Sequence, residues 1–358
     1  MAAARLLVAR GRARAGVLAG IAAVAVVLAG LGTIVGGLLL AAPVDAVRAG
    51  LAAASGADGS LRWQTRLDDD PDAQSDAAAQ LLDRLLLPSG AIWERSVQTL
   101  PVAATADGRP LQADGADVGA VLLADPAAPH RAQLVDGIWH DDPGAADAAT
   151  AAGPGAVPAT VQADAAAATG VAPGSVLELG GIRLVVVGTW EPAAAGDPAW
   201  MGDPLVAGGV ADGGAGPFLV ADDVVAGLEA TAFARWTALP DADAATPDSA
   251  VALAAASARV EPALRDEAAL GGDGIIRSGA LDDTLAELAA GIGAMRAVAP
   301  LPLLLLGVAG AISLLRLAAL LGTERRGETV LLRARGASAT ALGRDAAVEA
   351  FVVAAPAA

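Results

Sequence analysis

An uncharged stretch, AGVLAGIAAVAVVLAGLGTIVGGLLLAA at residues 15–42, decides the expected fold. Its 28 residues, rising about 1.5 Å each, would make a helix longer than the roughly 30 Å hydrocarbon core of a bilayer. We therefore predict an uncleaved transmembrane helix here. The alternative is a cleaved signal peptide, because LLLAAP near Leu40 loosely resembles a cleavage site, although the apolar cores of signal peptides run only about 7–15 residues.

A second uncharged run occupies residues 297–315. Its 19 residues are enough to span a bilayer, and Pro300 and Pro302 lie in its first turns, where proline disturbs a helix least. We predict a second transmembrane helix over residues 296–321. The final apolar run, 346–358, is too short to span and contains a glutamate, so we interpret it as the start of a truncated third transmembrane helix.

Charge is divided unevenly between these runs and the region between them. Residues 43–295 hold 12 arginines and 36 acidic residues, a net charge of −24. Because arginine-rich segments stay in the cytosol, we predict cytosolic residues 1–14 and 322–345 and an extracytoplasmic domain at 43–280. The predicted localisation is the cell (plasma) membrane, multi-pass, with a cytosolic N-terminus. The arginines behind this prediction are Arg5, Arg10, Arg12 and Arg14 before the first run, and Arg325, Arg326, Arg333, Arg335 and Arg344 after the second.

Missing residue types exclude several chemistries. Without lysine the chain cannot build a standard phosphate-binding P-loop, so any ATP-driven function needs an ATPase from elsewhere. Without cysteine it has no thiol nucleophile and no thiolate metal site. The acidic domain disfavours nucleic acid and anionic lipid headgroups as its ligands, since both need a basic surface. We expect neither catalytic activity nor a cofactor bound by this chain.

The two histidines, His130 and His140, are the remaining metal candidates. The sequence HDD at 140–142 could contribute to a metal site, but no HExxH motif accompanies it. We favour a loop histidine over a metal ligand and expect no metal site.

Residues 43–280 alternate between strand and helix patterns, which predicts an α+β domain. The segment 141–158 is rich in Asp, Gly, Ala and Pro, which predicts a linker. A hairpin then turns at Gly180 and Gly181, and the apolar run from Val185 to Val187 predicts a strand covered on both faces. The expected strands are 61–67, 91–100, 118–125, 131–139, 217–221 and 234–239, and the expected helices are 76–87, 163–169 and 249–264.

Residues 281–295 carry apolar side chains along one helical face. The stripe consists of Leu281, Leu285, Leu288, Ile292 and Met295. This helix leads directly into the second membrane run. It is therefore either a stalk that carries motion of the domain into the membrane or an amphipathic helix packed on its own domain.

The predicted cytosolic loop contains ETVLLRAR at 328–335, which favours a helix with Glu328 in its first turn and arginines in its last. Gly336 is placed as its C-terminal cap, and Ser338 as the N-cap of a following helix. Such a helix suits a cytosolic protein partner. The alternative is that its arginines only set the topology and touch lipid headgroups.

The loop resembles that of a known family. The sequence ERRGETVLLRARGAS is similar to the cytosolic loop after the second transmembrane helix of FtsX-like permeases, the MacB/LolC/LolE type of ABC transporter subunit, and above all to their long actinobacterial members. The stretch AAAATGVAPGSVLELGGIRLVVVGTWEP, with DPAW at 197–200 and RW at 235–236, resembles their extracytoplasmic region. The chain departs from the pattern at Ser175, where the family has an aspartate.

The resemblance implies a membrane protein with transmembrane α-helices and a large extracytoplasmic α+β domain, MacB periplasmic-domain-like, with an inserted β-rich subdomain at 156–220. The chain would be the N-terminal portion of a permease subunit that couples ATP hydrolysis by a separate ABC ATPase to movement of its extracytoplasmic domain, for export or extraction of an unknown substrate. The coupling helix docked on that ATPase would comprise Glu328, Leu332, Arg333, Arg335, Gly336, Ala337 and Ser338.

The resemblance also implies partners and one rival function. ATP would be bound by the ATPase subunit. A second permease half or homodimer partner and the lipid bilayer complete the expected assembly, with no nucleic acid. The rival is an extracytoplasmic regulatory or binding module of an FtsX-type complex, which controls a cell-envelope enzyme without transport.

Overall fold

The computed structural model describes residues 15–270, 274–298 and 300–334, together with Gly336, Ser338 and Thr340. The chain divides into two compact units. One is Val44–Ile292, and the other consists of the described parts of Met1–Pro43 and Gly293–Ala358.

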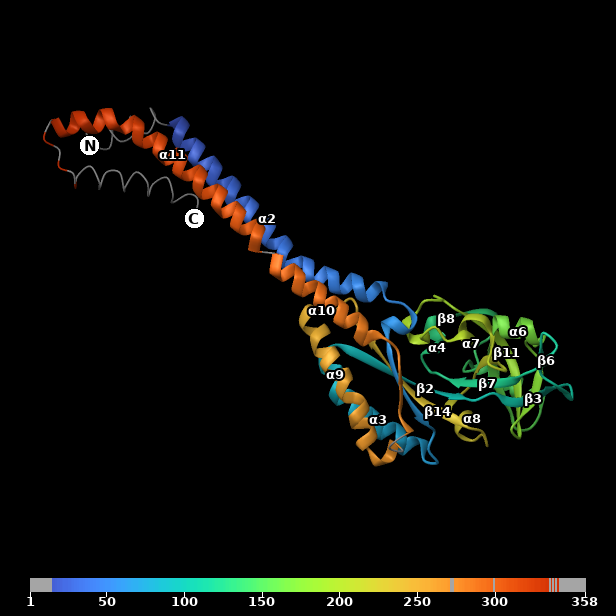
Figure 1. Ribbon diagram of the computed structural model, residues 1–358. Coiled ribbons are helices and arrows are strands. Elements are labelled where there is room, and N and C mark those ends of the chain that lie inside the picture. The colour runs from blue at the N-terminus through green and yellow to red at the C-terminus, as the bar shows by residue number, and fades with distance from the viewer. Residues whose placement is uncertain are drawn as a thin grey trace. The chain divides into compact units, whose positions relative to one another are not determined.

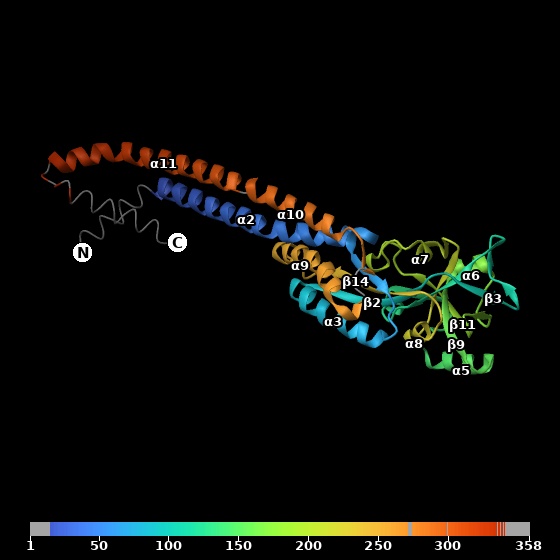
Figure 2. The same ribbon diagram turned by 60° about the horizontal axis from the view of Figure 1, so that its bottom comes forward.

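Long apolar helices form the second of these units, and two of them, α2 and α10, continue into the first. Helix α2 runs over Ala15–Ala53, α10 over Leu281–Val298 and α11 over Pro300–Ala334. Helices α2 and α11 lie side by side (Figures 1 and 2), and a Cβ at the buried Gly310 would lie 2.9 Å from Cδ1 of Leu28. By length and composition, the segments Ala22–Ala53 and Leu281–Leu317 are both able to cross a membrane.

Two helices differ in extent from the prediction. Helix α2 continues through Pro43 to Ala53, because one proline removes a single hydrogen bond and its alanine and leucine neighbours are good helix formers. Helix α11 continues to Ala334 without a break at Glu328, because no proline follows Pro302 in it. The separate short helix expected at 328–335 is therefore wrong, and its described residues form the last turns of α11.

The Val44–Ile292 unit is built on one sheet of 13 strands, with the order β12-β13-β9-β11-β10-β3-β7-β2-β14-β1-β15 and with β4 beside β3 and β8 beside β11. At one end, β1 (Leu61–Arg66), β14 (Ala232–Pro240) and β2 (Ala91–Thr99) pair antiparallel. Helices α3 (Pro71–Leu86) and α9 (Pro247–Asp266) pack on this end, as Figure 1 shows. The core between them contains Trp63, Leu82, Trp236, Leu253 and Val260. The edge strand is β15 (Ile276–Ser278).

The rest of the sheet forms a β-rich lobe with its own core, which includes Leu122, Leu177, Leu184 and Phe218. Its strands are β3 (Val102–Ala106), β4 (Arg109–Pro110), β7 (Gly119–Ala124), β8 (Ala132–Gly137), β9 (Ala156–Gln162), β10 (Val176–Leu179), β11 (Ile182–Pro192), β12 (Val210–Ala211) and β13 (Gly214–Leu219), beside a small sheet of β5 (Gln112–Ala113) and β6 (Ala116–Asp117). Its helices are α4 (Ala128–Arg131), α5 (Pro143–Ala152), α6 (Ala163–Thr169), α7 (Pro204–Gly208) and α8 (Asp222–Ala226). The 3-10 helices that the structure describes in full are η1 (Gly56–Gly59), η2 (Leu87–Ser89), η3 (Pro198–Trp200) and η4 (Ala268–Leu270).

Most of the predicted elements are confirmed, among them helix α6 and the hairpin of β10 and β11. The run from Val185 to Val187 is buried on both faces, as its unbroken apolar sequence indicated. The linker expected at 141–158 is wrong, since α5 and the start of β9 occupy it. Alanine is the best helix former, and α5 buries Ala145 and Ala149 against Val185 and Val187.

The β-rich lobe is also wider than the insert expected at 156–220. Strands β3 and β7, earlier in the chain, lie between β10 and β2 and contribute Ala104 and Leu122 to the lobe core. The extent of the lobe depends on hydrogen bonds between strands that are distant in sequence. A local sequence pattern cannot predict such pairings.

Candidate functional site

The two chain ends of the Val44–Ile292 unit lie together in its core. One buried cluster takes side chains from the last turns of α2 and from α10: Val47, Leu51, Leu281, Leu285 and Ile292. Gly50 marks the closest approach, because a Cβ there would lie 2.4 Å from Cδ2 of Leu288. This part of α10 is thus packed on its own domain, which was one of the two sequence interpretations. A role in carrying motion stays a prediction.

Hydrogen bonds also fix the start of α10 to η1, the turn that follows α2. The N–H of Ala280 donates to the carbonyl of Ala57 at 2.7 Å, and the Thr284 hydroxyl donates to the carbonyl of Asp58 at 2.8 Å. Gly279 precedes them with a φ of +97°, in the region that favours glycine. The chain therefore leaves the domain beside the place where it enters.

The turn η1 and its flanking residues also contact the segment around η3, which belongs to the β-rich lobe. The N–H of Gly56 donates to the carbonyl of Gly196 at 3.0 Å, and the Ser60 hydroxyl donates to the carbonyl of Pro198 at 2.7 Å. A Cβ on Gly59 would lie 2.6 Å from Cγ of Pro198. The segment after β11 thus reaches the junction of the two helices.

Two half-buried arginines extend this junction across the sheet. Arg62 donates from Nη2 to the carbonyl of Ala199 at 2.8 Å and from Nε to the Thr237 hydroxyl at 2.9 Å. Arg235 donates to the side chain of Gln98, and its Nη1 lies 3.9 Å from Oδ2 of Asp203. Burial lowers the pKa of Arg62, while burial and the charge of Arg62 lower the pKa of Arg235 to about 10. Both guanidiniums stay charged at neutral pH.

A third arginine, Arg131, ties the strand β2 to the same segment. It forms a bidentate ion pair with Glu94, and its Nε lies 3.9 Å from Oδ2 of Asp197. Burial lowers the pKa of Arg131, but the hydrogen bond and charge of Glu94 outweigh it and the net shift is upward. Beside it, burial raises the pKa of Asp125, whose Oδ1 accepts the N–H of Ala127 at 2.9 Å.

We expect Asp125→Asn to stabilise the protein more as the pH rises. The folded pKa of Asp125 lies above its unfolded value of about 3.9, so its contribution to stability is present below that value and is lost as pH rises through the folded pKa. Asparagine keeps the acceptor for Ala127 and carries no charge. The measurement is Tm from about pH 4 to pH 8, with the exposed Asp147→Asn as control; parallel Tm profiles for both variants would contradict the prediction.

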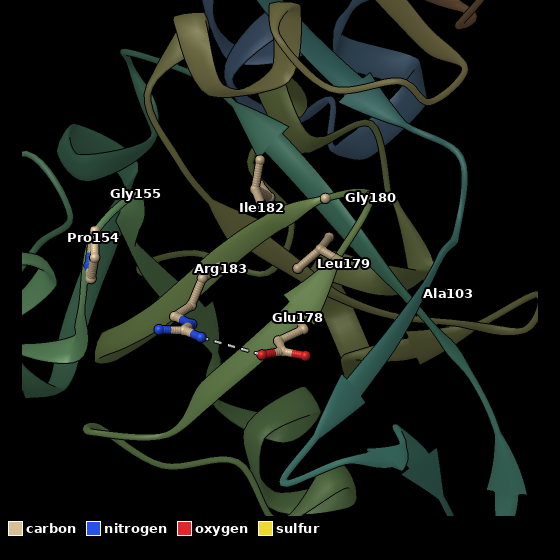
Figure 3. A pocket seen from close by; sticks show the side chains of 9 residues that line it. Ala103, Pro154, Gly155, Glu178, Leu179, Gly180, Ile182 and Arg183 are labelled. Carbon is tan, nitrogen blue, oxygen red and sulfur yellow. Dashed lines mark hydrogen bonds and ion pairs between the residues drawn. The ribbon is translucent and has the colours of Figure 1, made fainter.

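A surface hollow of about 490 Å³ lies at the β10–β11 hairpin, and Figure 3 shows the residues that line it. Glu178 and Arg183 point toward each other from neighbouring strands, with Nη2 of Arg183 at 3.5 Å from Oε1 of Glu178. Pro154 and Gly155 form the opposite wall. The two charges in the hollow neutralise each other.

A second hollow, of about 770 Å³, lies along α5 and contains His140, Asp141 and Asp142. Burial lowers the pKa of His140, although the two aspartates raise it, so the imidazole is neutral at pH 7. Among the described residues, no group of three His, Cys, Asp or Glu side chains is placed to hold a metal ion.

The residues predicted to dock an ATPase lie at the end of α11. Glu328, Leu332 and Arg333 belong to its last turns. Gly336 follows with a φ of +88°, the left-handed conformation of a C-terminal cap. Ser338 Oγ lies 3.0 Å from the Thr340 hydroxyl. Arg335 and Ala337 lie outside the described residues, and the docking role stays a prediction.

The sequence interpretation missed the half-buried arginines at the junction. A signal was available, because Arg62 and Arg235 alternate with apolar residues in LRWQTRL and FARWTAL. In a strand this spacing places them on the face opposite the tryptophans of the core. Their partners, Ala199 for Arg62 and Gln98 and Asp203 for Arg235, are far away in the sequence and carry no comparable signal.

In this fold, one α+β domain lies along the chain between two long apolar helices. No family model and no curated protein matches the chain. Among solved structures, the chain is similar to the periplasmic region of MacB from Actinobacillus actinomycetemcomitans, with 11% identity, 65% of this chain and 92% of that chain covered, and a TM-score of 0.30. It is also similar to the extracellular domain of the noncanonic ABC-type transporter YknZ from Gram-positive bacteria, with 11% identity, 49% and 82% covered, and a TM-score of 0.26.

Proposed function

We propose that the chain is a permease subunit of an ABC transporter, with α2 and α10–α11 crossing the membrane and the α+β domain on the outer side. The observation that carries this proposal is the junction of Gly50 with Leu288. Both chain ends of the domain meet in one core, and each continues as a helix apolar enough to span a bilayer. A domain built in this way leaves the membrane and returns to it at one place.

The same junction supports a mechanical role for the domain. The helix ends are buried in the core of one lobe, and η1 connects them to η3 of the other lobe. A shift of α2 or α10 would therefore act on both lobes together. ATP hydrolysis belongs to a partner subunit in this scheme, since the chain has no lysine with which to build a P-loop.

Charge supports the proposed orientation. The domain region carries a net charge of −24, whereas five arginines lie at residues 322–345. The positive-inside rule then leaves the end of α11 in the cytosol. There, the resemblance of ERRGETVLLRARGAS to permease loops makes it the surface that meets an ATPase.

Capture of the ATPase tests this proposal. The full chain carrying Arg333→Glu and Arg335→Glu should recover less than about a tenth of the ATPase that the unchanged chain recovers from detergent-solubilised native membranes, since reversing two docking charges costs several kcal/mol. The pair Arg333→Lys and Arg335→Lys keeps the charge that sets topology and should retain more. Equal recovery by all three chains would refute docking at this helix.

The rival function, a regulatory module that controls an envelope enzyme, has one feature in its favour. The hollow at the hairpin and the hollow along α5 share the wall formed by Pro154 and Gly155, which gives the domain an extended surface for a partner. Reconstituted vesicles decide between the two, because only a transporter moves or releases a substrate when ATP is hydrolysed.

A further inference from the structure

The strand β8 is the longest free edge among the described strands of the large sheet. Apart from β8, the strands that pair on one side only are β12, β15 and β4, which are two, three and two residues long. Strand β8 has six residues and pairs with β11 alone. Its second edge therefore presents a row of backbone N–H and C=O groups to which another strand can be added.

Strand β8 lacks most of the features that usually protect such an edge. It contains no proline and no lysine, and five of its six residues are exposed, so no other element covers it. Leu134 and Val135 are 36% and 53% exposed. The register with β11 shifts at Val135, which is a β-bulge, and a bulge can protect an edge or re-aim a side chain next to a functional site. Here the bulged residue is apolar and more than half exposed, which favours the second role.

The pairing with β11 assigns the side chains of β8 to two faces. Directly opposite residues of neighbouring strands point to the same face, and successive residues of one strand alternate between faces. The register places Gln133 opposite Glu191, Leu134 opposite Trp190 and Asp136 opposite Thr189. Gln133 and Asp136 thus lie on one face of the edge, together with Glu191, and Leu134 lies on the other. One face of the free edge is acidic and the other is apolar.

The acidic face carries charge that the surrounding residues do not neutralise. Asp136 accepts the N–H of Gly137 at 2.8 Å, and Glu191 accepts the side-chain amide of Gln133. Neither carboxylate forms an ion pair with any residue that the structure describes. Arg131, which directly precedes β8, is held by Glu94. A complementary occupant of this edge is therefore basic.

A strand added to β8 would set its alternate side chains against these two faces. Lysine or arginine would meet Asp136 on the acidic face, and an apolar side chain would cover Leu134 on the other. A second copy of the domain fits less well, because two regions of net charge −24 repel each other. We propose that the free edge of β8 binds an extended segment of a partner protein, in which basic and apolar residues alternate, as a further strand of the sheet. This surface belongs to the Val44–Ile292 unit alone, so the proposal does not depend on the permease assignment.

Binding of a synthetic peptide to the full purified chain tests the proposal. The probe is the fluorescein-labelled peptide Lys-Val-Arg-Val-Lys-Val, followed by fluorescence anisotropy, and its control is the same peptide methylated at every backbone nitrogen. Methylation keeps the charges and removes the N–H donors, so we expect roughly tenfold weaker binding of the control. Amide hydrogen exchange at residues 132–137 should slow with the first peptide and stay unchanged with the second.

Two charge reversals show whether the binding is local. Asp136→Lys should weaken binding of the unmodified peptide by roughly tenfold. Asp266→Lys makes the same change of charge at the exposed end of α9, far from β8 in Figure 1, and should change binding by less than about twofold.

Equal binding of the two peptides, or equal loss in the two variants, would reduce the effect to general charge attraction and overturn the proposal. Exchange at residues 132–137 that slows without peptide as the protein concentration rises would assign the edge to a second copy of the chain, which would overturn it as well.

Discussion

Replacing Gly279 with alanine should destabilise the protein by roughly 3 kcal/mol or more and release the start of α10 from η1. Its φ of +97° is strained for alanine, which costs about 1–2 kcal/mol. The added Cβ would lie 2.3 Å from the carbonyl oxygen of Ser60 and 3.1 Å from Cα of Leu61. These are backbone atoms that cannot rotate away, so overpacking adds about 1–3 kcal/mol.

Amide hydrogen exchange and thermal unfolding of the full chain measure this effect. The amide of Ala280, bonded to Ala57, should lose its protection first. The matched control is Gly155→Ala, where φ is +71° and nothing lies within 4 Å of the added Cβ. If both variants lose the same stability, backbone conformation alone explains the loss and the contact with η1 contributes nothing.

Gly50→Val is the second large effect, because it forces α2 away from α10. The new Cβ would lie 2.4 Å from Cδ2 and 3.3 Å from Cδ1 of Leu288. We expect a loss of about 1–3 kcal/mol in the free energy of unfolding from overpacking. If the junction transmits motion between the helices and the domain, ATP-driven work by the complex should also decrease in this variant.

A double substitution separates contact from other effects. Leu288→Ala opens the space that the valine needs, so Gly50→Val combined with Leu288→Ala should be less destabilised than the sum of the single variants, by about 1 kcal/mol. Gly291→Val on α10, with nothing within 4 Å of its Cβ, controls for valine in a helix. Strict additivity would show that the two positions do not meet.

Local pattern made part of the fold predictable. The stripe of Leu281, Leu285 and Ile292 had the period of a helix, and all three side chains are buried. The hairpin at Gly180 and Gly181 followed from two apolar strands around a glycine turn. These signals lie within a few residues of one another, which is why they can be read in sequence.

The junction could not be predicted in this way. Ser60 and Pro198 meet across 138 residues of sequence, and Arg62 reaches Ala199 across 137. Serine, proline and arginine are common residues whose partners only the strand order brings together. Likewise, an alanine-rich helix such as α5 has no contrast between its faces and reads as a linker, although tertiary contacts bury two of its alanines.

The predicted docking surface illustrates the opposite case. Its residues were singled out from charge and resemblance, and the structure adds that Glu328 and Arg333 continue α11. A helix that runs unbroken from the second apolar run to these residues is stiffer than a separate helix joined by a loop. In the proposed topology, a push on the cytosolic end of α11 would therefore reach its membrane segment directly.

We propose that the domain lies outside the membrane and the end of α11 inside, where an ATPase can reach it. The chain has no cysteine, so a single introduced cysteine is the only thiol in it that a maleimide can label. Asp147→Cys on the domain and Thr340→Cys after α11, both at exposed positions, are treated with a membrane-impermeant maleimide in intact cells and then in permeabilised cells. We predict labelling of position 147 in intact cells and of position 340 only after permeabilisation. Labelling of 340 in intact cells, or of 147 only after permeabilisation, would contradict the account.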